Sequence, residues 1–150
     1  VPDDLNKVVA DSVALYRQAH HEVEYILELD EGMPQVDIDS SQMNRAIANL
    51  LENATTAVLD GGGAVKRVTV RSVYDPEVHI ATLDIVDTGP GISKNIKDRM
   101  FEPYFSTKKG GTGLGLVIVS RIIADHNGFI RVRDNEPAGT IFSIELPVKE

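Results

Sequence analysis

The stretch DTGPGISKNIKDRMFEPYFSTKKGGTGLG, which runs from Asp87 to Gly115, carries glycines at both of its ends. An apolar alternating run, residues 80–86, precedes it, and residues 116–119 that follow it look like the start of a buried helix. Glycine-rich backbone before a helix favours an anion, because bare amides point outward and the missing Cβ atoms let a phosphate approach closely. The stretch therefore predicts a nucleotide site between a strand and a helix.

The composition is that of one domain spanning residues 1–150, with 42% apolar residues and no cysteine. Disulfides and thiolate metal sites are excluded, and no apolar run reaches the roughly 18 residues of a membrane span. The net charge of -8 opposes binding to nucleic acid or to anionic lipid. We expect a cytosolic domain that binds a small anion, helped by local positive charge and a divalent cation. The start at Val1-Pro2 indicates a fragment of a longer protein.

Periodicity predicts the elements of the first half of the chain. Residues 2–16 have helical spacing, with Asp3 and Asp4 in the first turn, and residues 22–29 alternate as a half-buried strand. A short strand is expected at 36–39. Ser40 or Ser41 is expected to cap a second helix that runs to about residue 59, with Met43, Ile47, Leu50, Leu51, Ala54 and Val58 on one face.

The second half predicts strands 65–74 and 78–87, joined as a hairpin, and a short helical turn that begins at Ser93. Residues 114–126 are apolar almost all round and predict a buried helix, which Gly128 stops. Strands 129–133 and 140–146 follow. Three long helices and about five strands predict an α+β fold, a two-layer sandwich with a mixed sheet covered by helices on one face.

Asn49 and Asn53 are the first candidate ligands. They lie about 40° apart on one flank of the second helix, so they can point at the same object. An amide oxygen coordinates Mg²⁺ without adding charge. Taken alone, the pair is better explained as two solvated asparagines on an exposed face.

Asp87 is predicted to share the inward face of its strand with Leu83 and Ile85. A carboxylate there needs a donor, and the exocyclic amino group of adenine is a suitable one. The alternative is an Asx turn that ends the strand. Thr140 is expected to face inward from the last strand, where its hydroxyl could join Asp87 around a base.

The segment FEPYF, residues 101–105, gathers aromatic side chains in a polar loop and suits the anchor or hinge of a lid. Lys108 and Lys109 follow, placed to meet phosphate charge. The second glycine cluster matches neither the P-loop nor the dinucleotide fingerprint. No protein-kinase signature is present.

The order of these motifs closely resembles the N, G1, F and G2 boxes of sensor histidine kinases over nearly the whole chain. The segments that carry the resemblance are NLLENA (49–54), DTGPG (87–91), FEPYF (101–105) and GTGLGL (111–116). The resemblance implies the catalytic, ATP-binding domain of a two-component kinase with the Bergerat fold and a mobile lid. The sequence of residues 101–116 is similar to that of the nitrogen-regulation subgroup of these kinases.

By position, the resemblance makes Asn53 the Mg²⁺ ligand, Asn49 its phosphate-side neighbour and Asp87 the partner of the adenine amino group. It counts Asn49 and Lys108 as catalytic, with Lys108 holding phosphate. It places the following residues beside the nucleotide: Ala57, Gly89, Gly91, Ile92, Gly111, Thr112, Gly113, Leu114, Gly115, Leu116 and Thr140. Residues 92–112 would form the lid, expected to be mobile without nucleotide.

The resemblance also implies ATP and Mg²⁺ as cofactors, transfer of the γ-phosphoryl group to a histidine on a separate dimerisation domain, and a response regulator as the partner of the full-length kinase. The isolated domain would be a monomer in the cytoplasm, and its parent can be anchored in the inner membrane. At Thr56 many family members have a basic residue that touches phosphate, a contact that Lys108 or Arg99 could replace. His21 is a poor acceptor, because its surroundings have the period of a strand.

Two other functions stay open. An ATP hydrolase of the same fold would carry a glutamate at the position of Asn49, and an asparagine cannot act as a base. Glu52 could be one, although it is turned from Asn53 by about 100°. The second alternative is a nucleotide-responsive interaction module without catalytic activity, because binding needs nearly all of the same residues.

Overall fold

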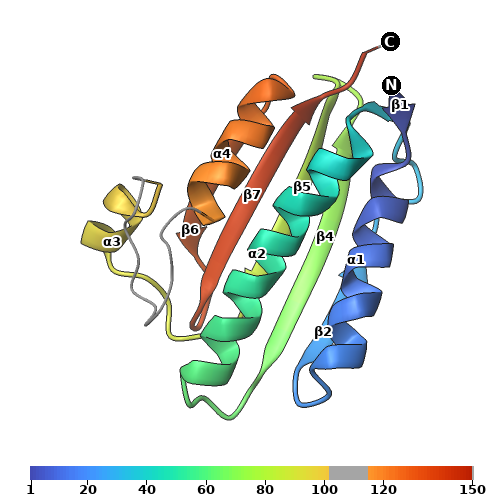
Figure 1. Cartoon of the computed structure of the whole chain (residues 1–150). Coiled ribbons are helices and arrows are strands. Elements are labelled where there is room, and N and C mark those ends of the chain that lie inside the picture. Colours follow the sequence, from blue (N-terminus) through green and yellow to red (C-terminus); the bar gives the residue numbers. More distant parts are fainter. Residues whose placement is uncertain (102–114, 150) are drawn as a thin grey trace.

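A five-stranded mixed sheet, with helices packed on one of its faces, forms the body of the molecule (Figure 1). The computed structural model describes residues 1–101 and 115–149. In chain order the elements are β1 (Pro2–Asp3), α1 (Leu5–Ala19), β2 (Glu24–Glu28), β3 (Val36–Asp37), α2 (Ser40–Asp60), β4 (Arg67–Asp75), β5 (Ile80–Asp87), α3 (Lys94–Arg99), α4 (Gly115–Asp125), β6 (Phe129–Asp134) and β7 (Thr140–Pro147). The main sheet has the order β2-β4-β5-β7-β6, in which only β2 and β4 pair in parallel. The predicted α+β sandwich is confirmed.

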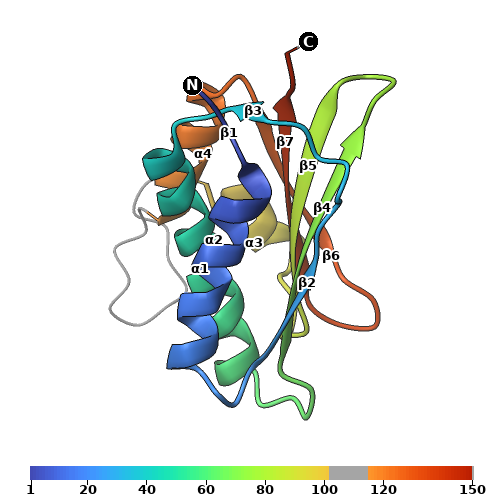
Figure 2. The same cartoon turned by 90° about the vertical axis from the view of Figure 1, so that its right-hand side faces the viewer.

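The helices α1, α2 and α4 lie on the same side of the sheet (Figure 2). The predicted apolar stripe of α2 is buried in full: Met43, Ile47, Leu50, Leu51, Ala54 and Val58. The inward residues of the central strands β4 and β5 meet it, among them Val70, Leu83 and Ile85. This shared core fixes α2 over the middle of the sheet, and with it the polar flank that carries Asn49 and Asn53. Among the described residues no helix is both long and apolar enough to cross a membrane.

The opposite face of the sheet is more exposed and carries charged side chains beside exposed apolar ones such as Phe129 and Val73. Neighbouring strands carry opposite charges there: Glu24 with Arg67 (2.6 Å), Glu28 with Arg71 (3.1 Å) and Glu145 with Arg131 (2.9 Å). These pairs are largely exposed, so each contributes little to stability. They place charged side chains on the face of the sheet that meets water.

Two predicted helix starts were wrong. The helix expected from residue 2 begins at Leu5, because Pro2 and Asp3 pair with Asp37 and Val36 as β1 against β3. Asp4 is the N-cap and accepts a hydrogen bond from the Lys7 N–H, so neither acid lies in the first turn. The second helix is capped by Asp39, not by Ser40 or Ser41, through the Gln42 N–H (3.1 Å).

The end of α4 differs in detail from the prediction. Asn127, not Gly128, adopts the left-handed conformation with φ 60°. The N–H of Gly128 then bonds the Ile123 carbonyl (2.9 Å) and that of Asn127 the Ala124 carbonyl (3.0 Å), which is the Schellman arrangement. Gly128 is required for space, since a Cβ would strike the Glu145 carbonyl oxygen. Of α4, only Val119, Ile122 and Ile123 are fully buried.

Candidate functional site

Asp87 ends β5 on the inward face of the sheet, as predicted, and only 3% of it is exposed. Its Oδ1 atom accepts hydrogen bonds from the backbone N–H groups of Gly89 (2.9 Å) and Thr140 (3.3 Å). The first bond is the Asx turn considered as the alternative, so that turn exists but occupies one oxygen only. Oδ2 accepts no hydrogen bond from any residue in 1–101 or 115–149. It keeps contact with solvent, because no fully buried polar side-chain atom lacks a partner among them.

The pKa of Asp87 is raised to about 6, chiefly because burial disfavours the charged form. The two backbone hydrogen bonds act in the opposite direction and hold the pKa below what burial alone would give. A buried carboxylate with one oxygen left unpaired is costly unless a donor arrives. The site is therefore chemically suited to a ligand that brings an N–H group.

The loop from Asp87 to Gly91 is held between α2 and the turn that joins β6 to β7. On one side, a Cβ on Gly89 would lie 2.9 Å from the Ala57 Cβ. On the other, a Cβ on Gly139 would strike the Asp87 carbonyl oxygen. Gly91 and Gly139 also have φ values of 84° and 112°, which glycine adopts without strain. Glycines at these positions let three segments of backbone close around Asp87.

Thr140 pairs with Asp87 across the β5–β7 ladder and is 3% exposed, so its predicted inward orientation is confirmed. Asn49 and Asn53 lie one turn apart on α2, and both are half-buried. Asn53 is one turn from Ala57, the residue against which Gly89 packs. The structure thus brings the Asp87 loop to the same flank of α2 that carries the two asparagines.

Glu52, the alternative base, is turned toward α1. Its Oε2 accepts a hydrogen bond from the Tyr16 hydroxyl (3.2 Å), which also bonds the Ala48 carbonyl oxygen (3.0 Å). Burial, and then the charge of Glu52, raises the pKa of Tyr16 to about 12. The carboxylate of Glu52 thus binds α1 to α2.

The predicted lid is partly described. Ile92 is half-buried against the core, and the expected helical turn is α3, with Ser93 as its N-cap. Gly115 opens α4, where a Cβ would meet nothing within 4 Å, and Leu116 is half-buried. The remaining predicted phosphate contacts lie outside the described residues: Lys108, Gly111, Thr112, Gly113 and Leu114.

Asn135 is a residue that sequence reasoning missed. Its side-chain amide donates to the Asp87 carbonyl oxygen (3.0 Å), from the turn between β6 and β7. No local pattern marks it, because the contact joins residues 48 positions apart. The one available signal was the prediction of the strand 140–146, which placed Thr140.

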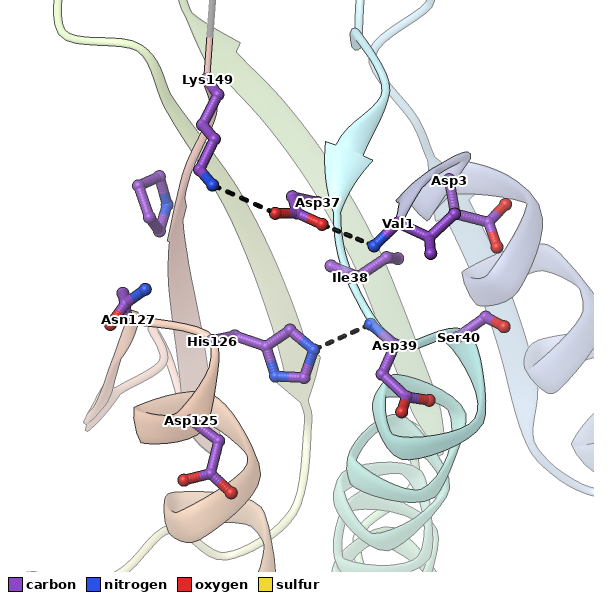
Figure 3. A pocket seen from close by; sticks show the side chains of 11 residues that line it. Val1, Asp3, Asp37, Ile38, Asp39, Ser40, Asp125, His126, Asn127 and Lys149 are labelled. Atoms are coloured by element: carbon purple, nitrogen blue, oxygen red, sulfur yellow. Dashed lines mark hydrogen bonds and ion pairs between the residues drawn. The ribbon is translucent and has the colours of Figure 1, made fainter.

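An open cavity of about 550 Å³ lies elsewhere, between the N-terminal end of α2 and the C-terminal end of α4 (Figure 3). It includes Pro147, at the end of β7 opposite Thr140, so it is remote from Asp87. Asp37 there pairs with Lys149, and His126 accepts a hydrogen bond from the Asp39 N–H (3.0 Å). No group of acids or histidines in 1–101 or 115–149 is arranged to hold a metal ion. This cavity therefore lies where the ends of two helices meet.

Comparison with known proteins gives the family of this chain. Residues 38–150 match the family model of histidine kinase-, DNA gyrase B- and HSP90-like ATPases. The chain is 36% identical over 132 residues to the sensory histidine kinase/phosphatase NtrB of Rhodobacter capsulatus, and 34% identical over 128 residues to sporulation kinase E of Bacillus subtilis. These matches cover 81% and 85% of this chain but 36% and 17% of the relatives.

The fold has the same relatives. The solved structure of the mycobacterial sensor histidine kinase MprB superimposes with a TM-score of 0.83 at 34% identity, covering 99% of this chain and 97% of that one. The chain spans about a third or less of the two curated relatives, so it corresponds to one part of such proteins. It belongs to the family of histidine kinase-, DNA gyrase B- and HSP90-like ATPases, as a catalytic domain of the sensor histidine kinase type.

Proposed function

We propose that this domain binds Mg-ATP and donates the γ-phosphoryl group to a histidine on a separate dimerisation domain. The observation that carries the proposal is the buried Asp87, with Oδ1 used by the backbone and Oδ2 left for a ligand. The exocyclic amino group of adenine supplies the missing donor. Guanine presents a carbonyl oxygen at that position, which a carboxylate repels, so the site selects adenine.

The residues on α2 fit a magnesium ion. Asn53 and Asn49 offer neutral amide oxygens on one half-buried flank, one and two turns from the Ala57 contact. Mg²⁺ keeps several waters and takes its other ligands from substrate phosphates, so a single protein oxygen from Asn53 suffices. When bound, the ion neutralises charge on the triphosphate. Asn49 would hold the phosphate chain beside it. Lys108 and residues 111–116 are proposed to contact the phosphates.

A transferase is favoured over a hydrolase by the residues beside that flank. Hydrolysis needs a base to activate water, and Asn49 cannot be one. Glu52 accepts a hydrogen bond from Tyr16 and faces α1, away from the proposed phosphate site. The domain would contribute positioning and charge stabilisation, and the attacking nitrogen would come from its partner.

The partners follow from this division of labour. The acceptor histidine would lie on the dimerisation domain of the same protein, and the phosphoryl group would pass on to a response regulator. We propose that the isolated domain is a cytoplasmic monomer. Nitrogen regulation is one subgroup among the similar proteins, with a sporulation kinase at comparable identity, so the stimulus is not assigned.

The test mixes the domain with Mg-ATP labelled on the γ-phosphate and a separately produced dimerisation domain of its parent. Label on histidine supports the proposal, free phosphate indicates a hydrolase, and neither product indicates a binding module. Asp87→Asn should abolish labelling. Asp60→Asn is a matched control, because Asp60 is an exposed acid at the end of α2.

A further inference from the structure

The turn between β6 and β7 contacts the backbone of Asp87 directly. The Asn135 side chain donates to the Asp87 carbonyl oxygen (3.0 Å), while the Asn135 N–H closes the turn on the Gly139 carbonyl (3.0 Å). Gly139 packs so tightly on the Asp87 carbonyl that no side chain fits there. One short turn therefore reaches Asp87 through both a hydrogen bond and backbone contact.

Asp87 is thereby held at two points. Its Oδ1 atom is fixed by the Gly89 and Thr140 N–H groups, and its carbonyl oxygen by Asn135. With both the carboxylate and the main chain fixed, the direction of Oδ2 is set before any ligand arrives. A hydrogen bond that reads a base depends on that direction, because it weakens steeply as the angle departs from linear.

The turn is itself fixed to a neighbouring element. Asp134, which precedes Asn135, accepts an ion pair from Lys97 of α3 (2.8 Å), and the Lys97 side chain is only 21% exposed. Asp134 also pairs with Thr140 in the β6–β7 ladder. The position of Asn135 is thus fixed both by the β6–β7 ladder and by α3, so its hydrogen bond can fix the Asp87 backbone.

We propose that Asn135 is a positioning residue for base recognition, which acts through Asp87 and sharpens the preference for a ligand that carries an amino group. The inference rests on the proposed function, since it specifies how the adenine-reading carboxylate is aimed. It differs from a merely structural role in one measurable way. A variant that disturbs the structure of the site should bind every nucleotide more weakly. A variant that only misdirects Asp87 should lose affinity only for a nucleotide that carries the amino group.

The experiment compares dissociation constants for ATP and for purine riboside 5′-triphosphate, which lacks the 6-amino group, by calorimetry with Mg²⁺. In Asn135→Ala the affinity for ATP should fall about fivefold, the effect of one ordinary hydrogen bond. The affinity for the analogue should change less than about twofold on the same reasoning. Glu136→Gln, in the same turn, is the matched control and should leave both constants unchanged.

Asn135→Leu is a second variant of nearly the same size that lacks the donor and adds no charge, and it should give the same loss of preference. Circular dichroism melts confirm that each variant is folded. Equal weakening of both nucleotides, or unchanged preference in both variants, overturns the inference but leaves the proposed function intact. A native domain that binds the two nucleotides equally refutes base reading by Asp87 and this inference with it, whereas a native domain that binds neither nucleotide refutes the proposed function.

Discussion

Burying the ionised carboxylate of Asp87 costs free energy, unlike burying the apolar side chains of the core. Burial raises its pKa to about 6 from the ordinary 3.8, so the ionised form strains the ligand-free protein at neutral pH. Such a cost is expected at a binding site and is unusual in a purely structural Asx turn, which an asparagine could make equally well.

The first prediction concerns this cost. Because the folded pKa lies above the unfolded one, the folded state holds the proton between pH 3.8 and about 6, and stability falls as the pH rises through that window. Asp87→Asn removes the charge. Without nucleotide at pH 7.5, the free energy of unfolding should rise by on the order of 2 kcal/mol, a gain that shrinks toward pH 4. Urea unfolding at both pH values measures it; a variant destabilised equally at both would contradict the burial argument.

Nucleotide binding should depend on pH in the opposite sense. Only the ionised carboxylate offers Oδ2 as an acceptor for the amino group, so affinity for ATP should fall as the pH drops below about 6, the folded pKa of Asp87. The limiting slope is about tenfold per pH unit for one proton. Calorimetry at pH 5 and 7.5, with purine riboside 5′-triphosphate correcting for phosphate protonation, checks this. Parallel curves for the two nucleotides would rule out titration of Asp87 as the cause.

At the residue scale, the sequence predicted those positions whose environment is set by their own element. The period of two placed Asp87 and Thr140 inward, and helical spacing placed Asn49 with Asn53. The contact of Asn135 was not predicted, because it depends on a carbonyl group in another strand. The choice between an Asx turn and base reading by Asp87 needed coordinates too, since only they separate Oδ1 from Oδ2.

Among the elements, α2 determines the site, because one of its flanks packs on α1 and another carries the proposed ligand residues. The flank toward α1 is fixed by Ser12 to Asn44 and by Tyr16 to Ala48 and Glu52. The next flank, with Asn49 and Asn53, carries the proposed metal site. Local periodicity predicted this helix well. It could not predict β1, whose two residues are strand only because they pair with β3.

Glu52 therefore has a structural task. Glu52→Ala should leave the rate of histidine labelling within about twofold and lower stability by about 1 kcal/mol or less, because the lost bond is partly exposed. Labelling assays and thermal melts measure the two effects. Tyr16→Phe is the control from the other side of the bond; it also removes the contact with the Ala48 carbonyl oxygen, so it should lower stability at least as much and leave the labelling rate unchanged. If Glu52→Ala lowered the rate of histidine labelling more than about tenfold, Glu52 would have a catalytic role instead.

The short helix α3 has no buried residue of its own. Its ion pair from Lys97 to Asp134 should therefore govern its order. Lys97→Ala should speed hydrogen exchange of the α3 amides by up to about fivefold, since a partly exposed ion pair contributes at most about 1 kcal/mol. Lys94→Ala is the control, because Lys94 pairs within α3 with Asp98. Exchange measured by mass spectrometry that is unchanged in both variants would show that α3 is held by other contacts.

Considered as a whole, the molecule joins a site from segments that are distant in the chain. The β5–β7 pairing sets Asp87 against Thr140, 53 residues later, and α2 crosses the same point through Ala57. The sequence allowed one hairpin and the other strands to be predicted, but not the order of strands in the sheet. The parallel pairing of β2 with β4 and the place of β7 between β5 and β6 depend on packing between distant segments.

Because the site draws on several segments, nucleotide should stabilise the entire domain rather than one loop. ATP at a hundred times its dissociation constant should raise the free energy of unfolding by about 2.7 kcal/mol, which for a domain of this size shifts the melting temperature by roughly 5 to 10 °C. GTP at the same concentration should give little shift, and Asp87→Asn should lose the shift with ATP. Melts with Mg²⁺ and each nucleotide make the measurement. An equal rise with ATP and GTP would mean that the triphosphate alone is bound, and Asp87 would then have no part in reading the base.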